Sequence, residues 1–331
     1  MDLIHANAEK TEIGFIDDFI KFDAEITRTA DIKDNQFVLT LDENVWGDSP
    51  ILKGHFVYIP FTEWGGPVEH IKHSTKSAQI TLTGPTWRGM LTRKIIEPPA
   101  GEAYRTISNM EASAALRLVI GDMFGDYFRI SDMNTEIAVS GSWRYTNLLS
   151  GIMDMFARSG LALSCAYDNT ICKAILQARK ITDYSRYVDL SQDYGIHLTS
   201  QQGGLEAFNH IIALGRGELT DREVIHLYRL DDGTITQTPP GNRGEKDLCT
   251  TYDYSSAEST EELIKGAAKR LEECVPVGSV EMDTSATDKP LELGDRVSAR
   301  DRLTGFVTTA TVQRKILVKT ANGETIETKV G

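Results

Sequence analysis

The two histidines that follow Glu69 are spaced in a way that could hold a metal ion. The stretch reads Glu69-His70-x-x-His73. A zinc protease needs H-E-x-x-H on a helix, so that both imidazoles share a face, and the inverted order needs histidine where Gly66 stands. Neither order is present, and in the strand expected here residues three apart point to opposite faces. The sequence therefore predicts exposed or partly packed histidines and no metal site.

Two pairs of glycines suggest phosphate binding but lack the residues that complete such a site. Gly84 and Gly89 have the spacing of the two P-loop glycines. Met90 and Leu91 stand where lysine and serine or threonine would hold phosphate and magnesium. The glycines of Leu214–Gly217 lack the G-x-G-x-x-G continuation of a dinucleotide site. Both pairs are interpreted as turn glycines, and no cofactor is predicted.

Carboxylate pairs and cysteines do not form a recognisable catalytic set either. Asp17-Asp18 and Asp231-Asp232 are adjacent in sequence, so neither pair can flank a glycosidic bond. There is no G-x-S-x-G elbow. The cysteines contain no C-x-x-C pair and are expected to be small buried residues, with a zinc site or a disulfide as the alternative; they are Cys165, Cys172, Cys249 and Cys274. We therefore predict no catalytic, cofactor-binding or metal-binding residue and no enzymatic activity.

A short basic patch beside a tryptophan has two interpretations. Trp87, Arg88, Arg93 and Lys94 lie close together in a chain whose formal net charge is −13. The simpler interpretation is a solvated turn whose tryptophan enters the core. The alternative is a contact between subunits, because tryptophan and arginine are enriched at interface centres and a basic spot can meet an acidic neighbour. These four residues are the candidate interface residues.

The segment that contains this patch follows a run of short predicted strands. Residues 1–93 are expected to form a first β domain, a barrel or a sandwich, because short alternating strands separated by turn residues are typical of both; the family resemblance described below implies the β-barrel. The expected strands are Phe19–Arg28, Gln36–Leu41, His55–Phe61, Val68–His73 and Ile80–Thr83. Gly65-Gly66-Pro67 and Gly84-Pro85 are interpreted as turns between them.

The middle of the chain changes to a helical period. Residues 94–183 are expected to form an α/β insert domain, with helices over Met110–Ile120 and around Leu149–Phe156 and a strand over Leu161–Tyr167. Gly160 has the position of a helix C-cap, and Arg158 complements the carbonyl end of the helix.

The last part of the chain is expected to be β again. Residues 184–331 are predicted to form a second β domain with one amphipathic helix over 259–273, which begins with the capping box Ser259-x-x-Glu262. Hairpins are expected around Gln202-Gly203-Gly204, around Asp231-Asp232-Gly233 and at the closing Asn322-Gly323 turn.

Composition excludes several classes of function. A folded chain of 331 residues with 40% hydrophobic and 25% charged residues has room for two or three domains. The net charge of −13 repels phosphate backbones and anionic lipids, which argues against specific nucleic-acid binding and against membrane association. No apolar run approaches a bilayer span, and the first residues do not read as a signal peptide. The chain is therefore expected to be made in a host cytoplasm.

Four segments, in order, resemble a known family of phage tail hub proteins. They are Ser77–Pro99, which contains Gly84-Pro85-Thr86-Trp87-Arg88-Gly89, then Arg144–Leu163, Asn209–Gly215, and Leu291–Asp301 followed by Thr304-Gly305. This order is similar to that of the ReqiPepy-type tail-associated family. The resemblance implies a mainly β fold with an α/β insert, in which two tube-like β-barrel domains and a helical insertion form a baseplate hub.

The same resemblance implies a structural role at the tail tip of a phage, prophage or tail-like bacteriocin. The hub would be a homotrimer that adapts a hexameric tail tube to a threefold tip. Its partners would be the tail tube protein, distal tail protein, tape-measure protein and a spike or receptor-binding protein, with DNA passing unbound through a lumen that acidic side chains could line. Two alternatives stay open: a carbohydrate-binding adhesin that uses Trp46, Trp64 and Trp143, and a cell-wall hydrolase.

Overall fold

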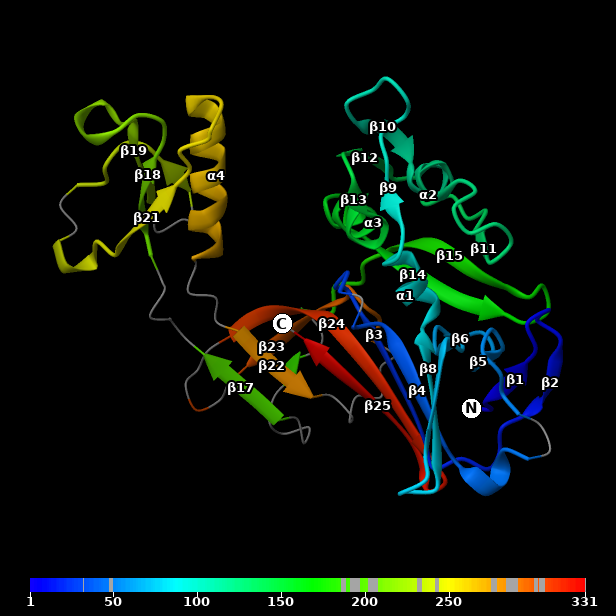
Figure 1. Cartoon of the computed structure of the whole chain (residues 1–331). Coiled ribbons are helices and arrows are strands. Elements are labelled where there is room, and N and C mark those ends of the chain that lie inside the picture. The colour runs from blue at the N-terminus through cyan, green and yellow to red at the C-terminus, as the bar shows by residue number, and fades with distance from the viewer. Residues whose placement is uncertain are drawn as a thin grey trace. The chain divides into compact units, whose positions relative to one another are not determined.

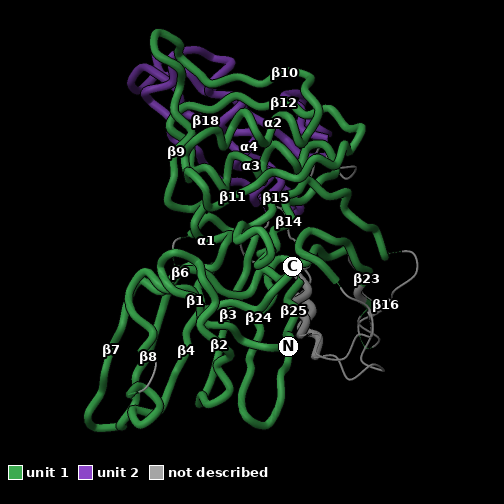
Figure 2. The backbone as a smooth tube through the Cα atoms, turned by 90° about the vertical axis from the view of Figure 1, so that its right-hand side faces the viewer, with its two compact units in different colours: residues 1–198, 281–331 green, residues 199–280 purple. Residues whose placement is uncertain are grey.

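The structure is a computed structural model, and its backbone divides into two compact units. It describes residues 1–31, 33–47, 50–185, 189–190, 197–201, 208–230, 234–241, 244–274, 279–283, 291–300, 303 and 307–330. One unit combines residues 1–198 with 281–331, and the other comprises residues 199–280, as Figure 2 shows by colour.

A ten-stranded sheet dominates the larger unit and contains strands from both ends of the sequence. Its main path runs β17-β22-β25-β24-β3-β4-β8-β7, and β23 joins β24 to β16. The strands are β3 (Lys21–Thr27), β4 (Gln36–Asp42), β7 (His70–Ser74), β8 (Gln79–Pro85), β16 (Asp189–Leu190), β17 (His197–Gln201), β22 (Ser279–Asp283), β23 (Arg296–Arg300), β24 (Val307–Thr320) and β25 (Gly323–Val330).

The central strands form because apolar and polar residues alternate along them. In β3 the side chains of Phe22, Ala24 and Ile26 are buried, while the residues between them lie on the other face. The predicted hairpin of β3 and β4 is confirmed, since Phe22 pairs with Leu39. The predicted closing hairpin is confirmed as well, because β24 and β25 meet at a turn next to Gly323.

Strands β3 and β24 lie side by side and antiparallel, with Leu317 opposite Ala24 (Figure 1). The first and last β segments therefore share one sheet, whose main path is open at β7 and β17. Within the described residues no sheet closes on itself, so the predicted pair of closed barrels is not found there. The mainly β architecture with an α/β portion is confirmed.

A second sheet has the strand order β2-β1-β5-β6, and two glycine-proline sites that were predicted to be turns lie in strands, one in this sheet and one in the ten-stranded sheet. Its strands are β1 (Ile4–Ala6), β2 (Glu12–Phe15), β5 (Phe56–Tyr58) and β6 (Gly65–Pro67). The stretch Gly65–Pro67, expected to be a turn, pairs with β5, and Gly84 and Pro85 belong to β8. A Cβ on Gly84 would lie 1.9 Å from the carbonyl oxygen of Pro67, so this glycine permits close backbone contact instead of a turn.

The α/β portion of the larger unit confirms the predicted helices. These are α2 (Ala112–Ile120) and α3 (Leu148–Ala157), and the strands around them are β9 (Ile95–Ile96), β10 (Arg105–Glu111), β11 (Phe128–Ile130), β12 (Ala138–Trp143), β13 (Thr146–Asn147), β14 (Leu161–Asp168) and β15 (Lys173–Lys180). Leu149, Ile152 and Phe156 of α3 are fully buried, and Gly160 has the positive φ of +67° expected of a helix-ending glycine. These side chains belong to a core cluster that includes residues of β1 and β5.

The smaller unit is a four-stranded sheet with helix α4 (Thr260–Glu273) packed on one face. Its strands are β18 (His210–Leu214), β19 (Val224–Arg229), β20 (Ile235–Thr236) and β21 (Cys249–Asp253). Ser259 caps α4 as predicted, because its hydroxyl accepts a hydrogen bond from Glu262 N at 3.2 Å. The hairpin of β19 and β20 is confirmed, although the predicted turn residues Asp231-Asp232-Gly233 lie outside the described residues.

One predicted hairpin is wrong. Strands β17 and β18 were expected to pair across Gln202-Gly203-Gly204, yet they belong to different sheets. Those three turn residues lie outside the described part of the chain. Separately, no helix in the described ranges combines the length and apolar character needed to cross a membrane.

Candidate interaction site around Trp87 and Arg88

The segment that carries the basic patch is a short helix, α1 (Trp87–Leu91), and not only a turn. Thr86 caps it, because its hydroxyl accepts a hydrogen bond from Gly89 N at 3.3 Å and donates one to the carbonyl oxygen of Asn35 at 3.0 Å. A Cβ on Gly89 would lie 2.2 Å from that same carbonyl oxygen. The helix is therefore held against the turn that precedes β4.

Trp87 lies in a buried stack of aromatic rings. Its indole is 1% exposed and lies parallel to the Tyr167 ring of β14, with 4.3 Å between ring centroids and 3° between planes. Phe56 and Tyr58 of β5 lie 6.0 and 6.4 Å from it. Burial raises the pKa of Tyr58, whose hydroxyl donates to Glu12 Oε1 at 3.0 Å. The stack joins the β1–β5 part of the unit to the α/β part.

Arg88 is buried too, and it makes an internal ion pair. Its Nε lies 2.5 Å from Glu63 Oε1, and its Nη2 lies 3.1 Å from Glu63 Oε2 and 2.8 Å from the carbonyl oxygen of Leu163. Burial raises the pKa of the Glu63 carboxyl, and the adjacent guanidinium opposes that shift. Arg88 thus links α1, the residues after β5 and strand β14. The expectation of a solvated arginine is wrong at this position.

Arg93 and Lys94, unlike the first two candidates, lie at the surface. Arg93 forms an ion pair with Glu69. The Lys94 ammonium lies over the Phe124 ring, 5.5 Å from its centroid. Lys94 also lines an open groove of about 670 Å³. The structure therefore separates the predicted patch into a buried pair and a surface pair, and contact of any of the four with another subunit stays a prediction.

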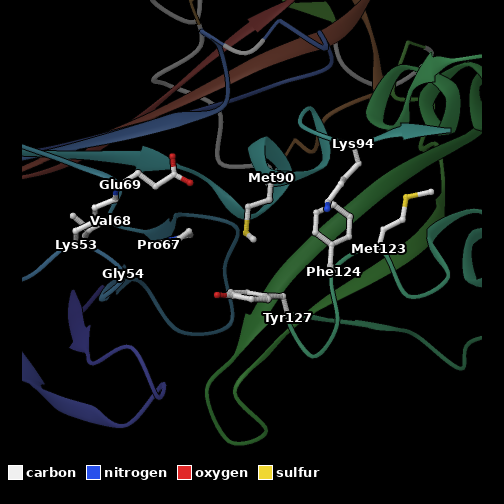
Figure 3. Close-up of a pocket in the computed structure, with 10 residues that line it drawn as sticks. All are labelled: Lys53, Gly54, Pro67, Val68, Glu69, Met90, Lys94, Met123, Phe124 and Tyr127. Carbon is white, nitrogen blue, oxygen red and sulfur yellow. The ribbon is translucent and has the colours of Figure 1, made fainter. Parts of the chain in front are cut away.

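This groove, which we call the Met90 groove, is formed by four segments of the larger unit (Figure 3). Its lining residues are Lys53, Gly54, Pro67, Val68, Glu69, Met90, Lys94, Met123, Phe124 and Tyr127. No sequence pattern marks this groove, because its lining residues come from four separate segments of the chain. Lys94 is the one predicted candidate that lines it.

The residues that could have done metal or acid–base chemistry are dispersed. His70 and His73 lie exposed on edge strand β7, as predicted, and His73 Nε2 lies 3.0 Å from Glu43 Oε2. Asp17 and Asp18 border a shallow groove of about 390 Å³ beside β2, and Asp231-Asp232 lies outside the described residues. Across the described ranges no three potential metal ligands converge.

The cysteines match the expectation only in part. All four are free: Cys165 and Cys274 are buried, Cys172 is half-buried, and Cys249 is exposed. Burial raises the pKa of the Cys165 thiol well above its ordinary value, so this residue stays a thiol and packs as a small apolar side chain. The prediction of a buried cysteine is wrong for Cys249.

The structure contains two histidine pairs that no sequence pattern predicted. His5 Nε2 lies 2.8 Å from His55 Nδ1, and His210 Nε2 lies 2.9 Å from His226 Nδ1, with Asp247 Oδ2 3.1 Å from the other His210 nitrogen. Their partners are 50 and 16 residues apart in sequence, so no local pattern marks them.

The aromatic residues proposed for sugar binding are mostly unavailable. Trp64 and Trp143 are 5% and 6% exposed, respectively. Trp46 is half-buried and borders two shallow grooves. The prediction of three exposed tryptophans that stack on sugars is therefore wrong.

Comparison with known proteins shows similarity at the level of structure. No family model matches the sequence, and no curated protein matches it. The structure is similar to the prophage MuSo2 43 kDa tail protein from Shewanella oneidensis, with 11% identity, 100% of this chain and 98% of that chain covered, and a TM-score of 0.59.

Two further tail proteins show the same likeness. Prophage tail protein gp18 from Listeria monocytogenes EGD-e has 13% identity, 99% and 94% coverage and a TM-score of 0.55. The tail protein from Neisseria meningitidis MC58 has 12% identity, 99% and 95% coverage and a TM-score of 0.52. The chain therefore has a phage tail protein fold over nearly its whole length.

Proposed function

We propose that this chain is a structural hub protein of the tail tip, or baseplate, of a phage or phage-tail-like particle, as members of the ReqiPepy-type family are taken to be. The observation that carries the proposal is the likeness of fold to three tail proteins, which covers at least 94% of each of them. A likeness over a single domain would not support a shared architectural role to the same extent. The dispersed polar residues described above favour a structural role over a catalytic one.

In this proposal the protomers form a trimeric ring that adapts a hexameric tail tube to a threefold tip. Support comes from the ten-stranded sheet, which among the described strands has no partner beyond β7 at one end of its path or beyond β17 at the other. Unpaired strand edges pair readily with another chain, and contacts between two different edges generate a closed ring when the rotation between neighbouring copies closes. Copies joined edge to edge would make a continuous cylindrical sheet. In this cylinder the N-terminal and C-terminal strands of each protomer's sheet would take the place of the two predicted barrels.

The polar face of this sheet suits a channel wall that does not retain DNA. Its charges are largely paired within the protomer, in the pairs Lys21–Asp23, Arg314–Glu25 and Lys329–Glu327, at 2.7, 3.0 and 3.1 Å. If this face lines the lumen, pairing of opposite charges, and not a surplus of carboxylates, would keep DNA from adhering. The tail tube, distal tail, tape-measure and spike or receptor-binding proteins are the proposed partners, and the virion tail is the proposed location.

The test is the assembly state of the purified chain. Light scattering after size exclusion should give the mass of a trimer, and electron microscopy should show rings. A proline scan over His70–Ser74 should include positions where assembly is lost while the protomer stays folded, because proline is tolerated at an edge strand only where its missing N–H faced outward. A monomer at all concentrations tested, in the presence and absence of a tail tube protein, would contradict the ring.

A further inference from the structure

The Met90 groove has an apolar floor fixed to the core of the larger unit. Met90, Met123, Phe124 and Tyr127 are half-buried and pack against core residues. The Phe124 ring meets Phe128 edge-on at 4.9 Å between centroids. Aromatic rings held by the core give the floor a fixed shape, whereas methionine side chains adapt to different occupants.

The rim of this groove carries cations that have no carboxylate partner. Among the described residues, neither Lys53 nor Lys94 has a carboxylate within ion-pair distance. Lys10 does not line the groove, but its ammonium lies 4.7 Å from the centre of the Tyr127 ring and donates a hydrogen bond to the Asp126 carbonyl oxygen at 3.0 Å.

The nearby carboxylates, by contrast, are already engaged. Glu69 forms an ion pair with Arg93, and Asp126 forms one with Lys173. The groove is therefore a locally basic site in a chain whose formal net charge is −13.

We infer that the Met90 groove docks a segment of a partner protein in which a bulky apolar residue is flanked by aspartate or glutamate. The apolar residue would lie on the floor, displacing water from methionine and aromatic surface, and the carboxylates would meet Lys53 and Lys94. The groove volume of about 670 Å³ falls in the range of sites that hold compact ligands, about 300–1,000 Å³. The inference rests on the proposed function only in taking the partner to be another structural component of the particle.

The experiment uses the full-length chain and a random peptide library displayed on yeast. Selection is run against the wild-type chain and against the double variant Lys53→Glu, Lys94→Glu. Lys76→Glu is the matched control, because Lys76 is exposed in the β7–β8 turn away from the groove. Since Lys53, Lys94 and Lys76 are all exposed, each variant should keep the far-ultraviolet circular dichroism and melting temperature of the wild type.

Peptides enriched on the wild type and the control, but not on the double variant, are expected to carry an aromatic or aliphatic residue next to carboxylates. Their affinity should fall about tenfold or more in the double variant and should weaken with added salt. Equal enrichment on all three proteins, or selected peptides without acidic residues, would overturn the inference. Self-association that depends on Lys53 and Lys94 and that the selected peptides do not inhibit would assign the groove to a second copy, which also overturns it. Ring formation is measured separately, so failure of either proposal leaves the other standing.

Discussion

The guanidinium of Arg88 and the carboxylate of Glu63 form a buried, two-contact ion pair, with 1% and 9% of the side chains exposed. Because the second guanidinium nitrogen also donates to Leu163 O at 2.8 Å, the pair ties α1 to β14. Removing either partner leaves a buried charge without compensation. The pair therefore governs the stability of the junction between the two parts of the larger unit.

Single replacement of either partner should destabilise the chain strongly. Arg88→Met or Glu63→Leu is expected to lower the free energy of unfolding by about 3–5 kcal/mol, whereas the combined Arg88→Met, Glu63→Leu variant should recover most of that loss. Chemical denaturation in a double-mutant cycle measures the coupling. Arg93→Met, which removes the exposed ion pair with Glu69, is the matched control and should change stability by less than about 1 kcal/mol. Equal effects at Arg88 and Arg93 would contradict the assignment.

Replacement of Trp87 should separate lost volume from lost stacking. Trp87→Leu removes the ring that lies parallel to Tyr167 and should lower the free energy of unfolding by about 3–4 kcal/mol. Trp87→Phe should lower it less, because it keeps an aromatic face and removes an indole N–H that has no hydrogen-bond partner within the described residues. Thermal and urea unfolding of both variants test this order. If phenylalanine were the more harmful substitution, the stacking account would be wrong.

Replacing either of two strand glycines by alanine should destabilise the fold. A Cβ on Gly84 would lie 1.9 Å from the Pro67 carbonyl oxygen, and one on Gly66 would lie 2.1 Å from the Pro85 carbonyl oxygen. Gly84→Ala and Gly66→Ala are therefore expected to lower the free energy of unfolding by about 2–3 kcal/mol each. Gly14→Ala on β2 is the control, because nothing lies within 4 Å of its Cβ position. If the denaturation midpoints of all three alanine variants were equal, the backbones next to Gly84 and Gly66 would not approach as closely as the structure has them.

His5 should make the fold sensitive to mild acid. Burial, and then the neighbouring His55, lower the pKa of His5 from 6.5 to about 4. His5 therefore binds a proton near pH 6.5 in the unfolded chain but only near pH 4 in the folded chain. The free energy of unfolding consequently falls as the pH drops from 6.5 towards 4. Between about pH 7.5 and about pH 5, His5→Gln should lose about 2 kcal/mol less stability than the wild type.

The control for this pH effect is His70→Gln, because His70 is exposed on β7. Urea denaturation at the two pH values gives the loss for each protein. The His70 variant should follow the wild type, and a His5 variant with the same pH profile as the wild type would show that His5 titrates normally in the fold.

Features with a local cause could be predicted from the sequence. The buried face of α3 follows from apolar residues such as Ile152 and Phe156 at helical spacing. The closing hairpin was predicted from the dipeptide Asn322-Gly323, although Gly323 already pairs with Thr320 and the turn lies one residue earlier. The glycines of β6 and β8 were predicted to form turns, but they lie in strands. Their role is to let a backbone segment distant in sequence approach closely, and no local pattern shows this. For the same reason the sequence marked Arg88 but not Glu63 or Leu163, which are 25 and 75 residues from it.

The pairing of β3 with β24 has a consequence for the order of events in the cell. Residues Phe22–Thr27 are synthesised well before Arg314–Lys319, their neighbours in the sheet. Contacts between such distant residues form late and slowly. An unfinished chain would lack β24, the strand that joins the halves of the sheet, so the ten-stranded sheet can be completed only after β24 has been synthesised.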